Sequence, residues 1–415
     1  MSILLKSATI LDSDSQYHKQ TKDILIKDGF IENIADEING GDQIIDKKNL
    51  YISCGFFDSS VSFGEPGFEE RETLENGVAT ARKSGFTSIF LNPNLNPITD
   101  RNSGVKFLKQ QTNSKEIDLH PIGAMTKGFD GKNLAELFDM ANGGAIAFYD
   151  FKKPIQNGNL LKIALQYVQS FGGLIFSFPL DQNIAGQAQV NEDEFTTYIG
   201  LKGMPALAEE IQIARDLNIL TYTGGKLHIP NISTQKSVEL IKKAKNDGLN
   251  VTCSVAIHHL FFNSNVLGEF DSRYKVLPPL RTEADQLALV EAVQNGIIDM
   301  VTADHEPMNE EFKTLEFENA SFGSIGLESA FGVLNTIFDK ELTAELLSKT
   351  KSKFGLKNSK IEIGAEADLS LFNPELTYNF KDSHIFSKSK NSMFLGEELK
   401  GKVYGSIYKD SFYEN

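Results

Sequence analysis

Acidic and histidine side chains fall where short apolar runs of this sequence end. Asp58, Asp150 and Asp304 come at or just after such runs, and His258-His259 follows another. A zinc hydrolase site needs ligands that are mostly imidazole, and an open position for water. Asp150 and Asp304 could hold a hard cation together with waters, but only weakly, because two carboxylates are a small ligand set. The sequence therefore offers carboxylate chemistry with an incomplete set of metal ligands.

The histidines do not complete that set. If the run before His258-His259 continues as a strand, adjacent side chains point to opposite faces, so both rings cannot face one metal ion. We expect one of them to be a hydrogen-bonded structural residue. His228 lies inside an apolar run and is expected to be a core histidine. Asp304-His305 is the sharpest pair, because it follows the last apolar run of the series.

The apolar runs alternate with segments of helical spacing, several of which end in glycine, the usual residue just past a helix end. Strands are expected near residues 50–57, 86–91, 118–123, 145–148, 174–178, 226–229, 250–255 and 298–302. Eight strands alternating with helices is the count of a (β/α)8 barrel, in which chemistry sits at the carboxyl ends of the strands. A doubly wound open sheet is the alternative, although no Gly-x-Gly-x-x-Gly turn follows the first run.

Both ends of the chain differ from the middle. Residues 3–53 and the tail alternate apolar and polar side chains, which predicts antiparallel strands. Residues 27–30 (Lys-Asp-Gly-Phe) are typical of a hairpin turn. We therefore predict an α/β protein in which a small discontinuous β domain, residues 1–54 with 360–415, flanks a TIM-type (β/α)8 barrel over residues 55–359.

The composition is that of a folded, water-soluble protein. The 415 residues are 40% hydrophobic and 23% charged, and 56 acidic against 41 basic residues give a net charge of −15. This balance, without a basic stripe, disfavours nucleic-acid and acidic-membrane partners. No apolar run approaches the roughly 20 residues of a membrane span. Cys54 and Cys253 form no Cys-x-x-Cys pair and the amino-terminal stretch is too interrupted for a signal peptide, so a cytoplasmic location is expected.

Motifs along nearly the whole length resemble those of dihydroorotases of the long bacterial type, within the amidohydrolase superfamily. The matching segments include GFFDSSVSFGEPGFEERETLENG, FLNPNLNPITD, GAIAFYDF, LKGMPALAEEIQIARD, TGGKLHIPNIST, VTCSVAIHHL, YKVLPPLR, IDMVTADHEP, ASFGSIGLESAF and GAEADLSLFNP. So many collinear matches make the resemblance specific. It implies a (β/α)8 barrel with a small β domain formed from both termini. It also implies hydrolysis of dihydroorotate to N-carbamoyl-aspartate by metal-bound hydroxide.

At the metal site this sequence departs from the family motif. The family has Asp-x-His-x-His-x-Arg-Glu-Pro-Gly after strand 1, and its two metal histidines fall here on Ser60 and Ser62. The metal histidines of strands 5 and 6 fall on Ser177 and Asn231, while the metal-binding aspartate after strand 4 is kept as Asp150. Serine and asparagine are neutral oxygen donors that hold zinc poorly. The resemblance therefore implies a degenerate zinc site.

Most of the residues that contact the substrate in the family are also absent from this sequence. The catalytic aspartate of strand 8, which is also a weak metal position, is kept as Asp304, and one substrate asparagine is kept as Asn94. The arginine, asparagine and histidine of the family's substrate site fall on Gly64, Leu277 and Met308. Without the arginine, the carboxylate of dihydroorotate loses its bidentate partner. Without a metal, water keeps a pKa near 15.7 and forms no useful hydroxide at neutral pH.

Two hypotheses follow. The first is a non-catalytic, dihydroorotase-like protein of pyrimidine biosynthesis that needs no cofactor and acts structurally. Inactive dihydroorotase-like chains are partners of aspartate transcarbamoylase, so the resemblance implies that partner, together with a homo-oligomer. The second is an enzyme that opens dihydroorotate or another cyclic amide through an atypical zinc site, with Asp58, Asp150, Asp304 and His305 as candidates. Whether Asp150 and Asp304 are residual metal ligands or only strand-end hydrogen-bonding groups stays open.

Overall fold

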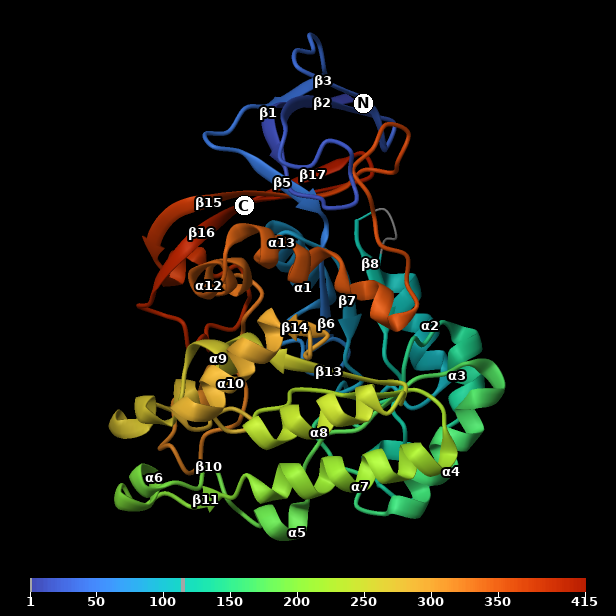
Figure 1. The fold of residues 1–415 in the computed structure, drawn as a ribbon, viewed down its shortest axis with the longest axis vertical. Helices are drawn as coiled ribbons and strands as arrows, with labels where there is room; N and C mark the ends of the chain where they lie inside the picture. Colours follow the sequence, from blue (N-terminus) through green and yellow to red (C-terminus); the bar gives the residue numbers. More distant parts are fainter. Residues whose placement is uncertain (1, 113–115) are drawn as a thin grey trace.

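A closed barrel of parallel strands forms the middle of the chain (Figure 1). The computed structural model describes residues 2–112 and 116–415. Within them the wall consists of one bridge position, Phe148, and strands β6 (Phe56–Val61), β7 (Phe86–Leu91), β8 (Asp118–Pro121), β9 (Ile175–Phe176), β12 (Leu227–Ile229), β13 (Val251–Ala256) and β14 (Met300–Thr302). Val61 of β6 pairs with His305 just after β14, which closes the barrel. The predicted fold class is confirmed, and the doubly wound open sheet is wrong.

Helices surround the strands, and the long α7 and α8 pack side by side (Figure 1). Thr73, Thr234 and Thr282 each accept a hydrogen bond from a backbone N–H in the first turn of the helix that follows, which fixes where α1, α8 and α10 begin. The helices are α1 (Leu74–Lys83), α2 (Asn102–Gln111), α3 (Leu137–Gly143), α4 (Gly158–Val168), α5 (Gln182–Ala185), α6 (Glu194–Tyr198), α7 (Leu207–Thr223), α8 (Gln235–Asn246), α9 (Ile257–Phe261), α10 (Glu283–Gln294), α11 (Glu310–Lys313), α12 (Ala330–Ile337) and α13 (Lys340–Ser348). A short parallel pair, β10 (Val190–Asn191) with β11 (Gly203–Met204), lies outside the barrel wall.

Strands from both ends of the chain share one separate sheet (Figure 1). Its order is β17-β16-β15-β5-β1-β2-β3, with β4 paired to β1. The strands are β1 (Ser2–Ile10), β2 (Thr21–Lys27), β3 (Phe30–Ala35), β4 (Gln43–Ile45), β5 (Tyr51–Cys54), β15 (Asp368–Asn379), β16 (Glu398–Tyr408) and β17 (Ser411–Glu414). The predicted hairpin at 27–30 is present, and its central residues Asp28 and Gly29 both have positive φ, as a type I′ turn requires. The exact limits of the two predicted domains stay a prediction.

The run expected as one strand at residues 50–57 is instead two strands in two different sheets. β5 ends at Cys54 in the terminal sheet, and β6 begins at Phe56 in the barrel. The backbone N–H of Gly55, between them, donates to the carbonyl oxygen of Asp368. A Cβ at position 55 would lie 1.9 Å from Oγ1 of Thr87 and 2.0 Å from Oδ1 of Asp368, so only glycine fits where the two sheets meet.

Two further expectations change in detail. The strand expected at 145–148 is reduced to the single bridge position Phe148, which pairs with Gly123 and Ile175. The strand before His258-His259 does not continue, because α9 begins at Ile257. The two imidazole rings therefore lie on one helical turn, with centroids 4.5 Å apart, rather than on opposite faces of a strand.

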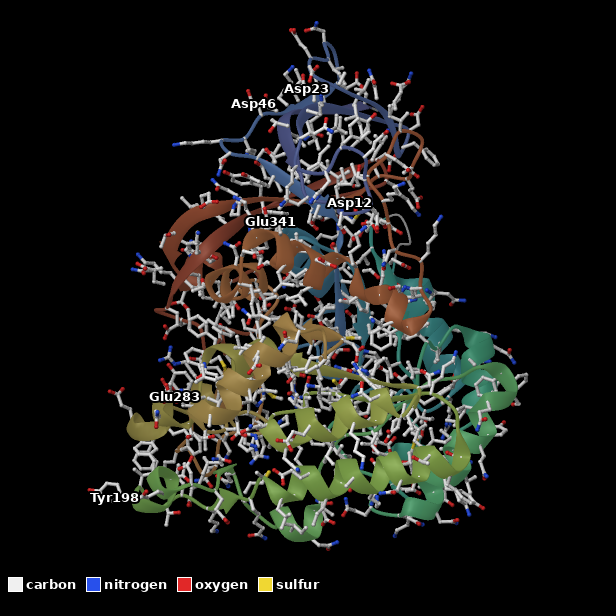
Figure 2. All side chains as sticks on the ribbon, in the orientation of Figure 1. Asp12, Asp23, Asp46, Tyr198, Glu283 and Glu341 are labelled. Carbon is white, nitrogen blue, oxygen red and sulfur yellow. The ribbon has the colours of Figure 1, made fainter. Side chains whose placement is uncertain are left out.

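Buried polar contacts join the terminal sheet to the barrel. Arg82 of α1 is fully buried, and its Nε donates to Oγ of Ser406 on β16 at 2.7 Å. Lys349, just after α13, pairs with Asp12 at 2.6 Å. Asp12 is labelled in Figure 2 where the sheet meets α13. These contacts, with Arg82 fully buried and Lys349 12% exposed, tie the terminal sheet to the barrel.

The barrel interior is filled by aromatic rings. Phe57, Phe90 and Phe176, on strands β6, β7 and β9, surround Phe354, a residue that follows α13. Ring centroids are 4.9 Å apart for Phe57 and Phe90, 4.8 Å for Phe90 and Phe354, and 5.8 Å for Phe176 and Phe354. His228 is fully buried against Phe176, as expected of a core histidine. Within the described residues, no helix combines the length and apolarity that a membrane crossing requires.

His228 makes the stability of the barrel depend on pH. Burial lowers its pKa to about 3, so the folded protein keeps the ring neutral while the unfolded chain takes up a proton below about pH 6.5. Its contribution to stability is therefore present above pH 6.5 and is lost as pH falls toward 3. We expect the difference in unfolding free energy between wild type and H228Q to change by roughly 1.4 kcal/mol per pH unit below pH 6. Urea denaturation between pH 5 and 8 measures this, and two parallel pH curves would contradict it.

Candidate functional site

Closure of the barrel brings several predicted site residues together at the carboxyl ends of β6, β7 and β14. Oγ of Ser60 lies 3.2 Å from Oδ1 of Asp304. Nδ2 of Asn92 donates to Oγ of both Ser60 and Ser62, each at 3.2 Å. Oγ of Ser62 in turn donates to Oδ1 of Asn94 at 3.2 Å. Positions 60, 62, 94 and 304 thus form one hydrogen-bonded network, linked by Asn92.

A lysine holds the acidic end of this network. Nζ of Lys152, just beyond the strand-4 bridge position, lies 2.8 Å from Oδ2 of Asp304 and 2.8 Å from Oε2 of Glu306. The Lys152 side chain is 9% exposed and that of Asp304 is 2% exposed. Lys152 and Asp304 both have positive φ, 53° and 45°, a backbone conformation that side chains of this size seldom adopt. The strained backbone at both residues points their side chains into the ion-pair cluster.

Sequence reasoning missed Lys152 and Glu306. Both follow predicted strand-end acids by two residues, Lys152 after Asp150 and Glu306 after Asp304. The basic pair Lys152-Lys153, placed just after a predicted strand end where several acids converge, is the signal that could have identified Lys152. Burial would lower the pKa of Lys152, but the charges of Asp304 and Glu306 outweigh this and hold it above its usual range. Lys152 is therefore a permanent cation in this site.

Asp58, on β6, is hydrogen-bonded to the end of β14, where the first and last barrel strands meet. Its carboxylate accepts hydrogen bonds from Oγ1 of Thr302 at 2.5 Å, from the N–H of Ala303 at 2.6 Å and from the N–H of Ser60 at 2.8 Å. Burial raises the pKa of Asp58 to about 7, against the opposing effect of these donors. Asp58 thus joins the end of strand β14 to strand β6.

Asp150, the predicted metal residue after strand 4, is hydrogen-bonded to the loop after β8. Its Oδ1 accepts from the N–H groups of Met125 and Thr126, both at 2.9 Å, and its Oδ2 accepts from the hydroxyl of Thr126. Both carboxylate oxygens therefore bind the loop after β8. Burial raises the pKa of Asp150 to about 6. Asp150 thus makes strand-end hydrogen bonds, and its residual metal role stays a prediction.

Ser177 and Asn231 do not join the network either. Oγ of Ser177 donates to Oδ2 of Asp216 on α7 at 2.6 Å, so this side chain faces the outer helix, and Phe178 faces the buried aromatic interior instead. Position 177, on which the family's strand-5 metal histidine falls, therefore lies outside the hydrogen-bonded network in this structure. Asn231 has φ 54°, its N–H donates to Oγ of Ser254, and its buried Oδ1 has no hydrogen-bond partner among the described residues.

The histidines next to the site are buried, and His259 and His305 each make hydrogen bonds through one ring nitrogen. Nδ1 of His305 accepts from the N–H groups of Gly326 and Leu327 at 3.2 and 3.4 Å, and burial lowers its pKa to about 4. Nε2 of His259 lies 3.1 Å from the carbonyl oxygen of Pro278. The expectation that one of His258-His259 is a hydrogen-bonded structural residue therefore holds for His259. Nδ1 of His305 thus faces the loop at 326, and the role of His305 as a candidate of the enzyme hypothesis stays a prediction.

These donors do not fit zinc. The network offers serine hydroxyls and asparagine amides, and its carboxylate, Asp304, already pairs with an ammonium group. In residues 2–112 and 116–415, no cluster of three or more histidine, cysteine, aspartate or glutamate side chains is arranged to hold a metal ion. Zinc prefers imidazole and thiolate ligands, and a fixed ammonium at the same place repels any cation.

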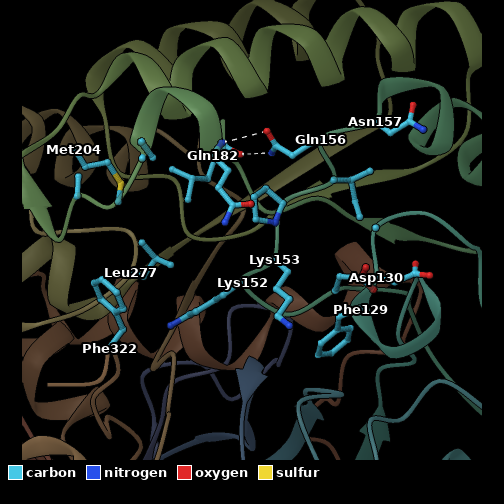
Figure 3. Close-up of a pocket in the computed structure, with 18 of the residues that line it drawn as sticks. Phe129, Asp130, Lys152, Lys153, Gln156, Asn157, Gln182, Met204, Leu277 and Phe322 are labelled. Carbon is cyan, nitrogen blue, oxygen red and sulfur yellow. Dashed lines mark hydrogen bonds between the residues drawn. The ribbon is translucent and has the colours of Figure 1, made fainter. Parts of the chain in front are cut away.

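A cavity of about 760 Å³ opens beside Lys152 (Figure 3). It lies over the loops that follow strands 4 and 5, and Lys152, Asp150 and Lys153 line it together with Gln156 and Gln182. The N–H of Gln182 donates to the side chain of Gln156 at 3.2 Å, drawn as a dashed line, which ties the two loops together. The barrel mouth therefore keeps a preformed space next to the ion-pair cluster.

Comparison with known proteins places the whole chain in one family. A family model described as "Dihydro-orotase-like" matches residues 50–237. A protein named dihydroorotase from Pelotomaculum thermopropionicum is 35% identical over 415 residues, which cover 98% of this chain and 97% of the relative. The chain belongs to the dihydroorotase family. A second protein of that name, from Caldicellulosiruptor saccharolyticus, is 38% identical over 98% of this chain and 97% of the relative.

Solved structures of similar fold are hydantoinases. L-Hydantoinase (dihydropyrimidinase) from Arthrobacter aurescens has a TM-score of 0.85 and 21% identity, and covers 99% of this chain and 95% of that one. D-Hydantoinase (dihydropyrimidinase) from Thermus sp. has a TM-score of 0.82 and 21% identity, with 99% and 94% covered. At this identity the likeness shows the fold alone, and it agrees with the barrel and terminal sheet of this dihydroorotase family member.

The donor set predicts that the purified protein carries far less than one zinc per chain. Serine and asparagine oxygens bind zinc weakly, and Lys152 adds electrostatic repulsion. Elemental analysis after gel filtration measures the zinc content, with an active dihydroorotase prepared in the same way as the control. A stoichiometric zinc that survives dialysis would contradict this expectation.

Proposed function

We propose that this member of the dihydroorotase family, a family of pyrimidine biosynthesis, does not hydrolyse dihydroorotate and acts as a structural partner in an enzyme assembly. The ion pair of Lys152 with Asp304 carries the proposal. Asp304 matches the family's catalytic aspartate, which has to move a proton. Here its Oδ2 is 2.8 Å from an ammonium and its Oδ1 accepts from Ser60. Both oxygens of this carboxylate are thus already in contact with protein donors, and a substrate would have to displace one of them.

The substrate side of the site supports the same proposal. The family's carboxylate-binding arginine falls on Gly64, and a Cβ at this position would lie 1.9 Å from the carbonyl oxygen of Phe68. The loop is closed around that glycine, because the N–H of Gly64 donates to Glu72 and the N–H of Phe68 donates to Gly64. No side chain fits at position 64 unless this backbone moves. An arginine could therefore not be restored here without changing the conformation of the loop.

The residues present do not supply a replacement for metal-activated water. Burial raises the pKa of Asp58, but its carboxylate is occupied by donors at the barrel seam. Asp150 is held by the Thr126 loop. Since the donors do not fit zinc, we derive no hydrolytic step through a metal for this chain. The structural role follows as the function that a folded barrel without hydrolytic groups can still serve.

A second candidate function is an enzyme that opens dihydroorotate or another cyclic amide through an atypical site. The cavity beside Lys152 and the hydrogen bond of Asn94 within the network favour it, because a space for a small molecule and one family substrate residue are both kept. The close relatives named dihydroorotase add to it. Turnover decides between the two candidates.

Dihydroorotate turnover by the purified protein is expected to stay at background, with or without added zinc. The reason is that neither an activated water nor a free catalytic carboxylate is available. An active dihydroorotase serves as the positive control, and the D304N variant as the matched negative control. Turnover that rises with zinc and disappears in D304N would overturn the proposal and favour the second candidate.

The proposed partner is aspartate transcarbamoylase, and the proposed state is a homo-oligomer within that assembly. We expect the transcarbamoylase of the same cell, co-expressed with this chain, to elute with it from gel filtration as one complex. We also expect its activity or thermal stability to fall when the chain is omitted. Light scattering gives the stoichiometry. Separate elution at micromolar concentrations of both proteins, with unchanged transcarbamoylase activity, would count against the assembly role.

A further inference from the structure

The cluster of Lys152, Asp304 and Glu306 is a buried charge arrangement that the fold has to satisfy. In the described residues, Lys152 is the cation within ion-pair distance of both carboxylates, at 2.8 Å from each. Lys313 also lies near Glu306, but its Nζ donates to the carbonyl oxygens of Ser272 and Ser321. Removing Lys152 would therefore leave two ionised groups buried side by side without a direct counter-ion.

The position of this cation is informative. Asp304 lies at the end of the last barrel strand and Ser60 at the end of the first, and both face the same point. In the family motif these two positions hold metal ligands. The ammonium of Lys152 thus contacts Asp304, at one of the two positions that would hold a metal ion. The oxygen donors present here fit zinc poorly.

We infer that Lys152 is a built-in cation that takes over the electrostatic role of the metal ion at this site. It supplies the positive charge that Asp304 and Glu306 require, and it makes the folded barrel independent of bound metal. This inference rests on the proposed loss of the metal site, and it adds a defined role for Lys152. A buried ammonium stabilises two buried carboxylates in the way that a bound cation would, while offering no Lewis acid to polarise a substrate.

The test is a charge-balance cycle followed by thermal unfolding at pH 7.5. K152A removes the cation, K152A/D304N/E306Q removes the cation and both carboxylates, and K153A is the control from the neighbouring exposed position in the same loop. We expect K152A to lower the melting temperature by about 3–6 °C, because one partner of a buried pair is removed. K153A should leave it within about 1 °C of wild type, since surface substitutions have small effects. The triple variant should recover at least half of the loss, since no buried charge is then unpaired.

Melting experiments with added metal distinguish a lysine that replaces a metal ion from an ordinary structural ion pair. Truncation at position 152 leaves oxygen donors of the kind that Mn²⁺ accepts. Millimolar MnCl₂ is therefore expected to raise the melting temperature of K152A while leaving wild type and the triple variant unchanged, and EDTA is expected to have no effect on wild type. The inference is overturned if K152A melts with wild type, if the triple variant is no more stable than K152A, if Mn²⁺ leaves K152A unchanged, or if EDTA destabilises wild type. These readouts are independent of turnover, so hydrolysis of dihydroorotate by wild type would contradict the proposed function separately.

Discussion

The seam between the first and last barrel strands is the constraint on which the rest of this structure depends. Asp58 on β6 accepts from Thr302 and Ala303 at the end of β14, and the N–H of Ser62 donates to the carbonyl oxygen of His305. These bonds close the parallel sheet on itself and leave it without edges. They also bring Ser60 and Asp304, 244 residues apart in sequence, within 3.2 Å. The site therefore exists only because the barrel is closed.

The buried carboxylates near this seam are stabilised by three different kinds of donor. Asp58 is stabilised by three donors from the strand ends, and burial still raises its pKa to about 7. Asp150 is stabilised by backbone and hydroxyl donors of the loop at Thr126. Asp304 and Glu306 are paired with the ammonium of Lys152. Each solution leaves the carboxylate in contact with protein donors, so none is free to act on a substrate without first losing a partner.

Much of the architecture could be predicted from the sequence because it rests on local patterns. The hairpin at 27–30, the alternating strands and helices and the terminal sheet follow from turn residues and periodicity, which act over a few residues. The direction of strand-end side chains could not be predicted. Ser177, on which a family metal histidine falls, donates to Asp216, and Asp150 accepts from Thr126, because one residue of register decides which face a side chain takes. Lys152 pairs with a residue 152 positions away, and no local pattern marks such a pair.

The core beneath the site explains how its chemistry can change while the fold persists. Phe57, Phe90 and Phe176 close around Phe354 and fill the barrel with apolar contacts that do not involve the strand-end network. Side chains at positions such as 60 and 62 can therefore differ without opening a cavity in that core. Charge is the property that still constrains the strand-end network. A buried carboxylate at a strand end needs a cation beside it, and where no metal is held the protein has to supply one. Lys152 meets that requirement from within the chain, and so the barrel can keep Asp304 although the donors around it do not fit zinc.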